Sequence, residues 1–102
     1  MKLADLGPFS NPSLLILASL AGGPKHGYGM MGDIQVMAEV RLGPGTLYGA
    51  LVRLEAAGLI QALPAKDRRR PYRLTAQGIA VLRDQLTMLQ RLASMGLDRL
   101  AS

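Results

Sequence analysis

Residues 43–75, GPGTLYGALVRLEAAGLIQALPAKDRRRPYRLT, contain the features that decide the fold. Gly43 and Pro44 are typical of a helix start and Gly58 of a helix end, so the segment begins with a helix. At about 100° per residue, one stripe of this helix is typical of a core-facing side and consists of Leu47, Leu51, Leu54 and Gly58. The opposite stripe lacks the charge of an ordinary surface helix and consists of Gly45, Gly49, Val52 and Ala56. This face is therefore either covered by another part of the protein or kept free for a partner.

The second half of the segment is typical of a β-hairpin with a basic tip. Residues 59–63 and 71–75 have strand-like composition, and the residues between them favour a turn. Five cations and one carboxylate lie between residues 66 and 73, a local charge of +4, which leaves only +1 of the total +5 for the rest of the chain. Such a concentrated patch on a small domain indicates a polyanion binder. The alternative is a solvated basic turn.

Two further helices are expected before this segment. Ser10 or Asn11 caps the first helix, which has a proline near its first turn and stays apolar until residues 22–23, both glycine. The second helix begins around residues 25–26 and continues through Met37. Both helices are short.

The last helix, from the cap Thr75 to about Leu100, has an apolar arc that is too wide for one packing surface. One stripe consists of Ile79, Leu82, Leu86, Leu89, Ala93, Leu97 and Leu100. A second, about 130° away by the same 100° step, consists of Val81, Met88, Leu92 and Met95. One stripe suffices for the helix to pack on its own domain, so the second predicts a two-fold homodimer; the alternative is that both are buried within one subunit. We expect dimer contacts at Leu82, Met88, Leu89, Leu92 and Met95.

Together these elements predict a mainly α fold, an α+β winged helix-turn-helix with a C-terminal dimerisation helix. The expected parts are an N-terminal extension at 1–11, a winged helix-turn-helix DNA-binding domain at 12–75 and the dimerisation helix at 76–102. In this arrangement the helix of the opening segment enters the DNA major groove. Small residues on its free face let the backbone approach bases and phosphates, and Val52 can meet a thymine methyl group.

Composition argues against several classes of function. The 102 residues include no cysteine and one histidine, so we expect no disulfide, no metal site and no cofactor. The seven acidic residues are scattered and no nucleophile lies beside a base, so we expect that the protein is not an enzyme. No apolar run approaches the ~20 residues that cross a bilayer, and a signal peptide is a poor fit. We therefore expect one soluble, cytoplasmic domain with no membrane partner.

Several short motifs along residues 12–78 match a known pattern. They are GPKHGY at 23–28, PGTLY at 44–48, AL at 50–51, RLE at 53–55, GLI at 58–60 and YRLT at 72–75, with Gly78. The chain thereby resembles the PadR family of bacterial transcriptional regulators, and most closely its short-tailed members. The resemblance implies a homodimeric repressor that binds a pseudo-palindromic operator in double-stranded DNA, with the third helix as reader and the hairpin as wing.

The resemblance and the charge pattern together define an expected DNA interface. The family motif implies DNA-side positions for Tyr28, Pro44, Gly45, Thr46 and Tyr48. His26 is expected to cap the second helix or to contact a phosphate. The complete expected interface is Lys25, His26, Tyr28, Pro44, Gly45, Thr46, Tyr48, Gly49, Arg53, Lys66, Arg68, Arg69 and Arg70.

The chain also departs from the family pattern. Gly43 replaces a common Ser and Gly49 a common Pro, so the capping and the groove-facing contour are expected to differ. Some relatives stack flat aromatic compounds on tryptophan between the long helices, and this chain has no Trp. A small apolar effector would instead lie in an adaptable cleft beside Met88, Met95 and neighbouring leucines. The alternative function is a winged-helix protein-interaction module that does not bind DNA.

Overall fold

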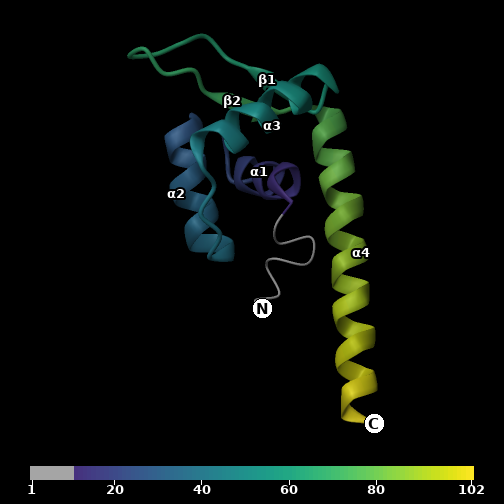
Figure 1. The fold of residues 1–102 in the computed structure, drawn as a ribbon. Coiled ribbons are helices and arrows are strands. Elements are labelled where there is room, and N and C mark those ends of the chain that lie inside the picture. Colours follow the sequence, from purple (N-terminus) through teal and green to yellow (C-terminus); the bar gives the residue numbers. More distant parts are fainter. Residues whose placement is uncertain (1–10) are drawn as a thin grey trace.

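Residues 11–102, which the computed structural model describes, fold into three short helices, a two-stranded hairpin and one long helix (Figure 1). The elements are α1 (Pro12–Leu20), α2 (Gly27–Ala38), α3 (Pro44–Ala56), β1 (Ile60–Ala62), β2 (Tyr72–Leu74) and α4 (Ala76–Ala101). The predicted winged helix-turn-helix with a long C-terminal helix is confirmed. The predicted N-terminal extension, residues 1–11, lies outside the described residues except for its last residue.

Three of the predicted helix caps are confirmed. The Asn11 side chain accepts hydrogen bonds from the N–H groups of the first turn of α1. Gly43 precedes Pro44 at the start of α3 and makes no side-chain cap. Thr75 Oγ1 accepts a hydrogen bond of 3.0 Å from the N–H of Gly78 at the start of α4. The predicted end of α3 is displaced slightly: the helix ends at Ala56, and Gly58 follows with a φ of +78°, a conformation that favours glycine.

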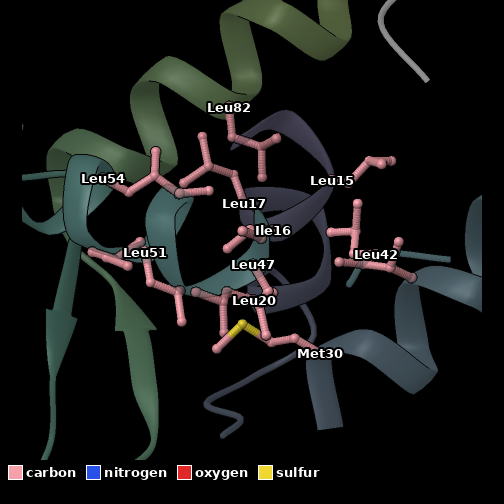
Figure 2. Packing of buried hydrophobic residues seen from close by; sticks show 13 residues of the cluster. Leu15, Ile16, Leu17, Leu20, Met30, Leu42, Leu47, Leu51, Leu54 and Leu82 are labelled. Carbon is pink, nitrogen blue, oxygen red and sulfur yellow. The ribbon is translucent and has the colours of Figure 1, made fainter. Parts of the chain in front are cut away.

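The core forms where α1 is enclosed by the other helices. Thirteen buried apolar residues make one cluster, and Figure 2 shows Leu82 pointing from α4 into it. The predicted core stripe of α3 is confirmed for Leu47, Leu51 and Leu54, which are all buried, whereas Gly58 follows the end of the helix and is exposed. The burial of the three leucines fixes the orientation of α3 about its own axis.

The hairpin forms the wing, and its strands are shorter than predicted. In the antiparallel register Ile60 faces Leu74 and Ala62 faces Tyr72. Beyond these pairs the ladder is irregular because residues 64 and 71 are prolines and have no N–H to donate. A third segment joins the sheet: Lys25 and Tyr72 exchange backbone hydrogen bonds of 2.9 and 3.2 Å. This pairing ties the start of α2 to the wing.

Helix α4 extends far beyond the domain that it begins in (Figure 1). The Cα radius of gyration is 14.7 Å, compared with the roughly 13 Å typical of a globular domain of 100 residues. Within residues 11–102 only Gly78 and Leu82 of this helix are buried, so this part of the chain does not bury both stripes, contrary to the alternative in which one subunit buries them. Even the first stripe packs on its own domain only near the start of the helix. None of the helices in residues 11–102 is both long and apolar enough to cross a membrane.

The junction between the wing and α4 yields a test of the fold. A Cβ on Gly78 would overlap the backbone of Leu59, whose carbonyl oxygen also accepts a hydrogen bond of 3.1 Å from the Thr75 N–H. We expect Gly78→Ala to lower the free energy of unfolding by about 2–3 kcal/mol, because neither backbone segment can move alone. Urea denaturation followed by circular dichroism measures the change.

Gly32→Ala is the matched control, since a Cβ there has no neighbour within 4 Å. It should raise the free energy of unfolding by about 0.5–1 kcal/mol through helix propensity. Equal effects of the two substitutions would contradict the assigned role of the junction.

Candidate nucleic-acid interface

The free face of α3 is uncovered, which decides between the two interpretations of the sequence. Within residues 11–102 nothing packs over Val52, which is 68% exposed, and Gly45 and Thr46 are also exposed. Tyr48 flanks this face and is 46% exposed. The side opposite the core is therefore open to an external partner.

Gly45 and Gly49 on this face are not required by the fold. A Cβ on Gly45 would have no neighbour within 4 Å, and one on Gly49 would meet only Arg53 Nη1 at 3.5 Å. Each glycine nevertheless weakens a helix by about 1 kcal/mol relative to alanine. Because packing within the chain does not explain them, the missing side chains leave space for an external partner.

The first turns of α2 and α3 meet closely. An ideal Cβ on Gly27 would lie 2.7 Å from Tyr48 Oη, so glycine at this position lets the tyrosine rest against the α2 backbone. The result is a cleft of about 270 Å³ between α2, α3 and the wing. Its lining residues are His26, Gly27, Tyr28, Tyr48, Arg68, Arg69, Arg70 and Tyr72.

All three tyrosines of the chain line this cleft, together with three arginines. Tyr28 and Tyr48 were predicted to belong to the interface, whereas Tyr72 was not. The signal that was available is its place in the YRLT motif beside the basic tip. Aromatic rings combined with guanidinium groups form a surface suited to a polyanion.

His26 has the capping role predicted for it. Its Nδ1 accepts a hydrogen bond of 3.3 Å from the Gly29 N–H, so the hydrogen of the neutral ring lies on Nε2. Nε2 is 3.4 Å from Nη1 of Arg69. Arginine has only donors, so two donors face each other here, and an anionic oxygen between them would accept from both.

The wing tip places cations on a tight turn. Lys66 and Arg69 exchange backbone hydrogen bonds of 2.8 and 2.9 Å across a two-residue loop. The loop residues Asp67 and Arg68 have φ values of 53° and 64°, as in a type I′ turn, which favours Asn-Gly. A non-glycine residue in this conformation costs roughly 1–2 kcal/mol. Arg68 therefore holds a guanidinium at the tip at the expense of stability.

Lys25 was predicted to belong to the interface, but its side chain makes contacts within the chain. Its Nζ donates to the carbonyl oxygen of Ser19 and lies 3.7 Å from Asp33 Oδ2. Ser19, which is fully buried, donates from Oγ to the same carboxylate at 2.7 Å. The ammonium group thus joins α1 to α2, and we assign Lys25 a structural role. A lone serine in the apolar run of α1 was the available signal.

The other predicted positions differ in exposure. The wing cations, Lys66, Arg68, Arg69 and Arg70, are exposed, as are Pro44 and Arg53 on α3. Among the described residues the one ion pair within 4 Å is Lys25 with Asp33, so the wing cations have no carboxylate partner there.

Of the predicted dimer contacts on α4, Met88, Leu92 and Met95 are exposed and Leu89 is half-buried. Leu82 is only 4% exposed in the core of its own chain, so it has little surface to offer a second subunit.

Comparison with known proteins identifies the family. The sequence profile of the transcriptional regulator PadR-like family matches residues 16–84, well over half of the chain. The chain belongs to the PadR-like family of transcriptional regulators. This assignment agrees with the resemblance noted in the motifs, and it places the chain in a family of regulators, not of enzymes.

Solved structures share the fold of this PadR-like chain. A PadR family transcription regulator from hypervirulent Clostridium difficile R20291 is 25% identical, with a TM-score of 0.75 over 82% of this chain and 92% of that chain. A transcriptional regulator from Clostridium thermocellum is 26% identical, with a TM-score of 0.71 over 81% of this chain and 86% of that chain. F93 from STIV, a winged-helix DNA-binding protein, is 17% identical with a TM-score of 0.71, covering 78% and 87% of the two chains.

A sequence relative extends beyond the length of this chain. A 37.1 kDa protein in transposon TN4556 of Streptomyces fradiae is 43% identical over 84 residues. The aligned part is 82% of this chain and 24% of the relative, so the PadR-like chain matches about a quarter of that protein.

The strained wing tip gives a prediction about stability. We expect Arg68→Gly to raise the free energy of unfolding by about 0.5–1 kcal/mol, because glycine removes the cost of a positive φ but adds freedom to the unfolded chain. Urea denaturation at a fixed protein concentration measures the gain.

The control is Ala65→Gly, since Ala65 lies in the same hairpin but not at a positive φ. This variant should be neutral or less stable than the parent. If Arg68→Gly were no more stable than Ala65→Gly, the turn would not be strained.

Proposed function

We propose that this PadR-like chain is a homodimeric, cytoplasmic transcriptional repressor that binds a pseudo-palindromic operator in double-stranded DNA. The proposal is carried by one observation: three features lie next to each other on one side of the molecule. They are the free face of α3, the tyrosine-lined cleft and the unpaired wing cations. Close fit and positive charge are thus combined at the element that winged-helix proteins insert into the major groove. Its membership of a regulator family supports the same function.

The parts of this surface have separate roles in the proposal. Helix α3 enters the major groove, where Thr46, Tyr48 and Arg53 offer hydrogen-bonding groups. The wing cations neutralise phosphates or enter the adjacent minor groove. The facing donors of His26 and Arg69, 3.4 Å apart, would hold one phosphate oxygen at the start of α2.

The dimer is proposed from the exposed apolar surface of α4. Met88 and Leu92 are 63% and 67% exposed, and Leu97 and Leu100 are 67% and 85% exposed. Met88 and Leu92 belong to the second stripe and Leu97 and Leu100 to the first, and a soluble monomer rarely exposes so much apolar surface on one helix. Pairing α4 with the same helix of a second subunit would cover part of this surface, and a two-fold dimer that reads successive major grooves needs its two α3 helices about 34 Å apart.

We also propose release by a small apolar effector. A cleft of about 600 Å³ lies between the end of α1, β2 and α4, a size suited to a small molecule. Its apolar lining includes Leu74, Ile79 and Leu86, whereas neither Met88 nor Met95 lines it. An effector here would lie between the winged domain and α4, and would change the angle between them and hence the spacing of the two α3 helices.

Charge removal at the wing tests DNA binding. In the variant Arg68→Gln/Arg69→Gln/Arg70→Gln we expect weaker binding to every duplex. The slope of log affinity against log salt should fall by about 0.9 for each phosphate that the wing no longer neutralises. Fluorescence anisotropy of a labelled duplex measures both quantities between about 50 and 200 mM salt. Over this range the affinity of a protein that neutralises several phosphates changes roughly 10³–10⁵-fold.

The control removes the same charge from α4, as Arg83→Gln/Arg91→Gln/Arg99→Gln, and should leave the slope nearly unchanged. If the wing variant bound as tightly as the parent, the wing would have no role. If the parent showed no salt-dependent binding to any duplex, the alternative of a protein-interaction module would replace the proposed function.

Substitutions on α4 test the dimer. We expect Met88→Glu/Leu92→Glu to convert the protein to a monomer, because two buried carboxylates in each subunit would have no partners. Light scattering after size exclusion should then give the 10.9 kDa mass of one chain instead of twice that mass. Ser94→Glu, on the polar face, should remain a dimer. An unchanged mass for the double variant would place the interface elsewhere.

A further inference from the structure

The free face of α3 has an unusual composition for a helix that reads bases. At about 100° per residue, the side directly opposite the core is occupied by Gly45, Gly49, Val52 and Ala56. Val52 is the one side chain among them that is larger than a methyl group, and it is 68% exposed. The centre of the face therefore has no hydrogen-bonding side chain, and its most prominent group is an isopropyl group.

Hydrogen-bonding groups are found only on the flanks of this face. Thr46 and Arg53 lie on one side and Tyr48 on the other. The Arg53 guanidinium folds back over Gly49, since a Cβ there would lie 3.5 Å from Nη1. Bidentate recognition of guanine or adenine needs Arg, Lys, Asn or Gln, and none of these occupies the centre of the face.

The major groove displays one apolar group to which such a centre is suited. The C5 methyl of thymine projects from the base edge, and an aliphatic side chain recognises it by apolar contact. Val52 is β-branched and has one strongly preferred rotamer in a helix, so it gives up little side-chain freedom when it meets a base. Val52 has no neighbour within residues 11–102 that covers it, so contact with a thymine methyl group would bury its exposed apolar surface.

The two glycines let so short a side chain reach a base. Since a Cβ on Gly45 would meet nothing within 4 Å and Gly49 faces only the flexible end of the Arg53 side chain, the backbone of α3 can approach the groove floor once that guanidinium turns aside. Without this clearance, a valine on the third turn of the helix would be held away from the base edges. The glycines and Val52 therefore work as one feature.

We propose that Val52 reads a thymine through its C5 methyl group, so that each half of the operator has an A·T pair at this position. This inference rests on the proposed binding of duplex DNA. It assigns base recognition at the centre of α3 to an apolar contact, while the wing supplies positive charge.

The test uses duplexes selected from a random library by the full-length protein. In the tightest duplex, each thymine in turn is replaced by deoxyuridine, symmetrically in both half-sites, which removes only the C5 methyl. We expect one position at which the affinity of the parent protein falls about fourfold per half-site and about fifteenfold for the dimer, as for removal of one buried methyl group at each site. Fluorescence anisotropy at fixed salt measures the change.

Two variants assign the methyl contact to a residue. Val52→Ala should bind the thymine and deoxyuridine duplexes with equal affinity. Val36→Ala, the same change at an exposed valine on α2, should keep the parent's sensitivity. Circular dichroism checks that both variants are folded.

The outcomes separate this inference from the proposed function. If the parent binds duplexes in a salt-dependent way but tolerates every deoxyuridine, the methyl readout is wrong and DNA binding stands. If Val52→Ala stays as sensitive as the parent, another residue reads the methyl group and the assignment to Val52 is overturned. If no duplex is bound with a salt-dependent affinity, the proposed function and this inference both fail.

Discussion

The burial of one side of α3 is the constraint on which the rest of the surface depends. Leu47 and Leu51 are almost completely buried, and their position in the core turns the opposite side of the helix outward. Tyr48 then lies against Gly27 and lines the cleft between α2, α3 and the wing. The free face, and the position of Tyr48 in the cleft, are thus consequences of the apolar packing of α3 on α1.

The glycines of the chain have two different physical explanations, which only the structure separates. At Gly78 a Cβ would clash with the backbone of Leu59, so the fold requires glycine there, and at Gly27 a Cβ would displace the Tyr48 side chain from the α2 backbone. At Gly45 and Gly49 the fold would accept a side chain, and helix propensity would favour one. The sequence shows the same letter in all these positions. Glycine that the fold does not need therefore points to an external partner.

Much of the fold could be predicted because its signals are local. Caps such as Asn11 and Thr75, and the stripe on α3, are read from residues within one or two turns. The features that were missed join residues distant in sequence: the pairing of Lys25 with Tyr72, and the contact of Ser19 with Asp33. For α4, periodicity gave the stripes correctly. It could not give the point after Leu82 at which the helix leaves its own domain.

In the proposed function, base recognition and electrostatic attraction are supplied by different elements of this surface, and the costs of these elements to the fold also differ. The wing tip holds Arg68 at a positive φ, which costs backbone strain but leaves the core untouched. The reading helix instead forgoes helix propensity at two positions and exposes Val52. Because the wing cations are exposed and form no ion pair within residues 11–102, a change in charge at the tip need not disturb the buried stripe that orients α3. Overall affinity and sequence preference can therefore vary independently on one scaffold.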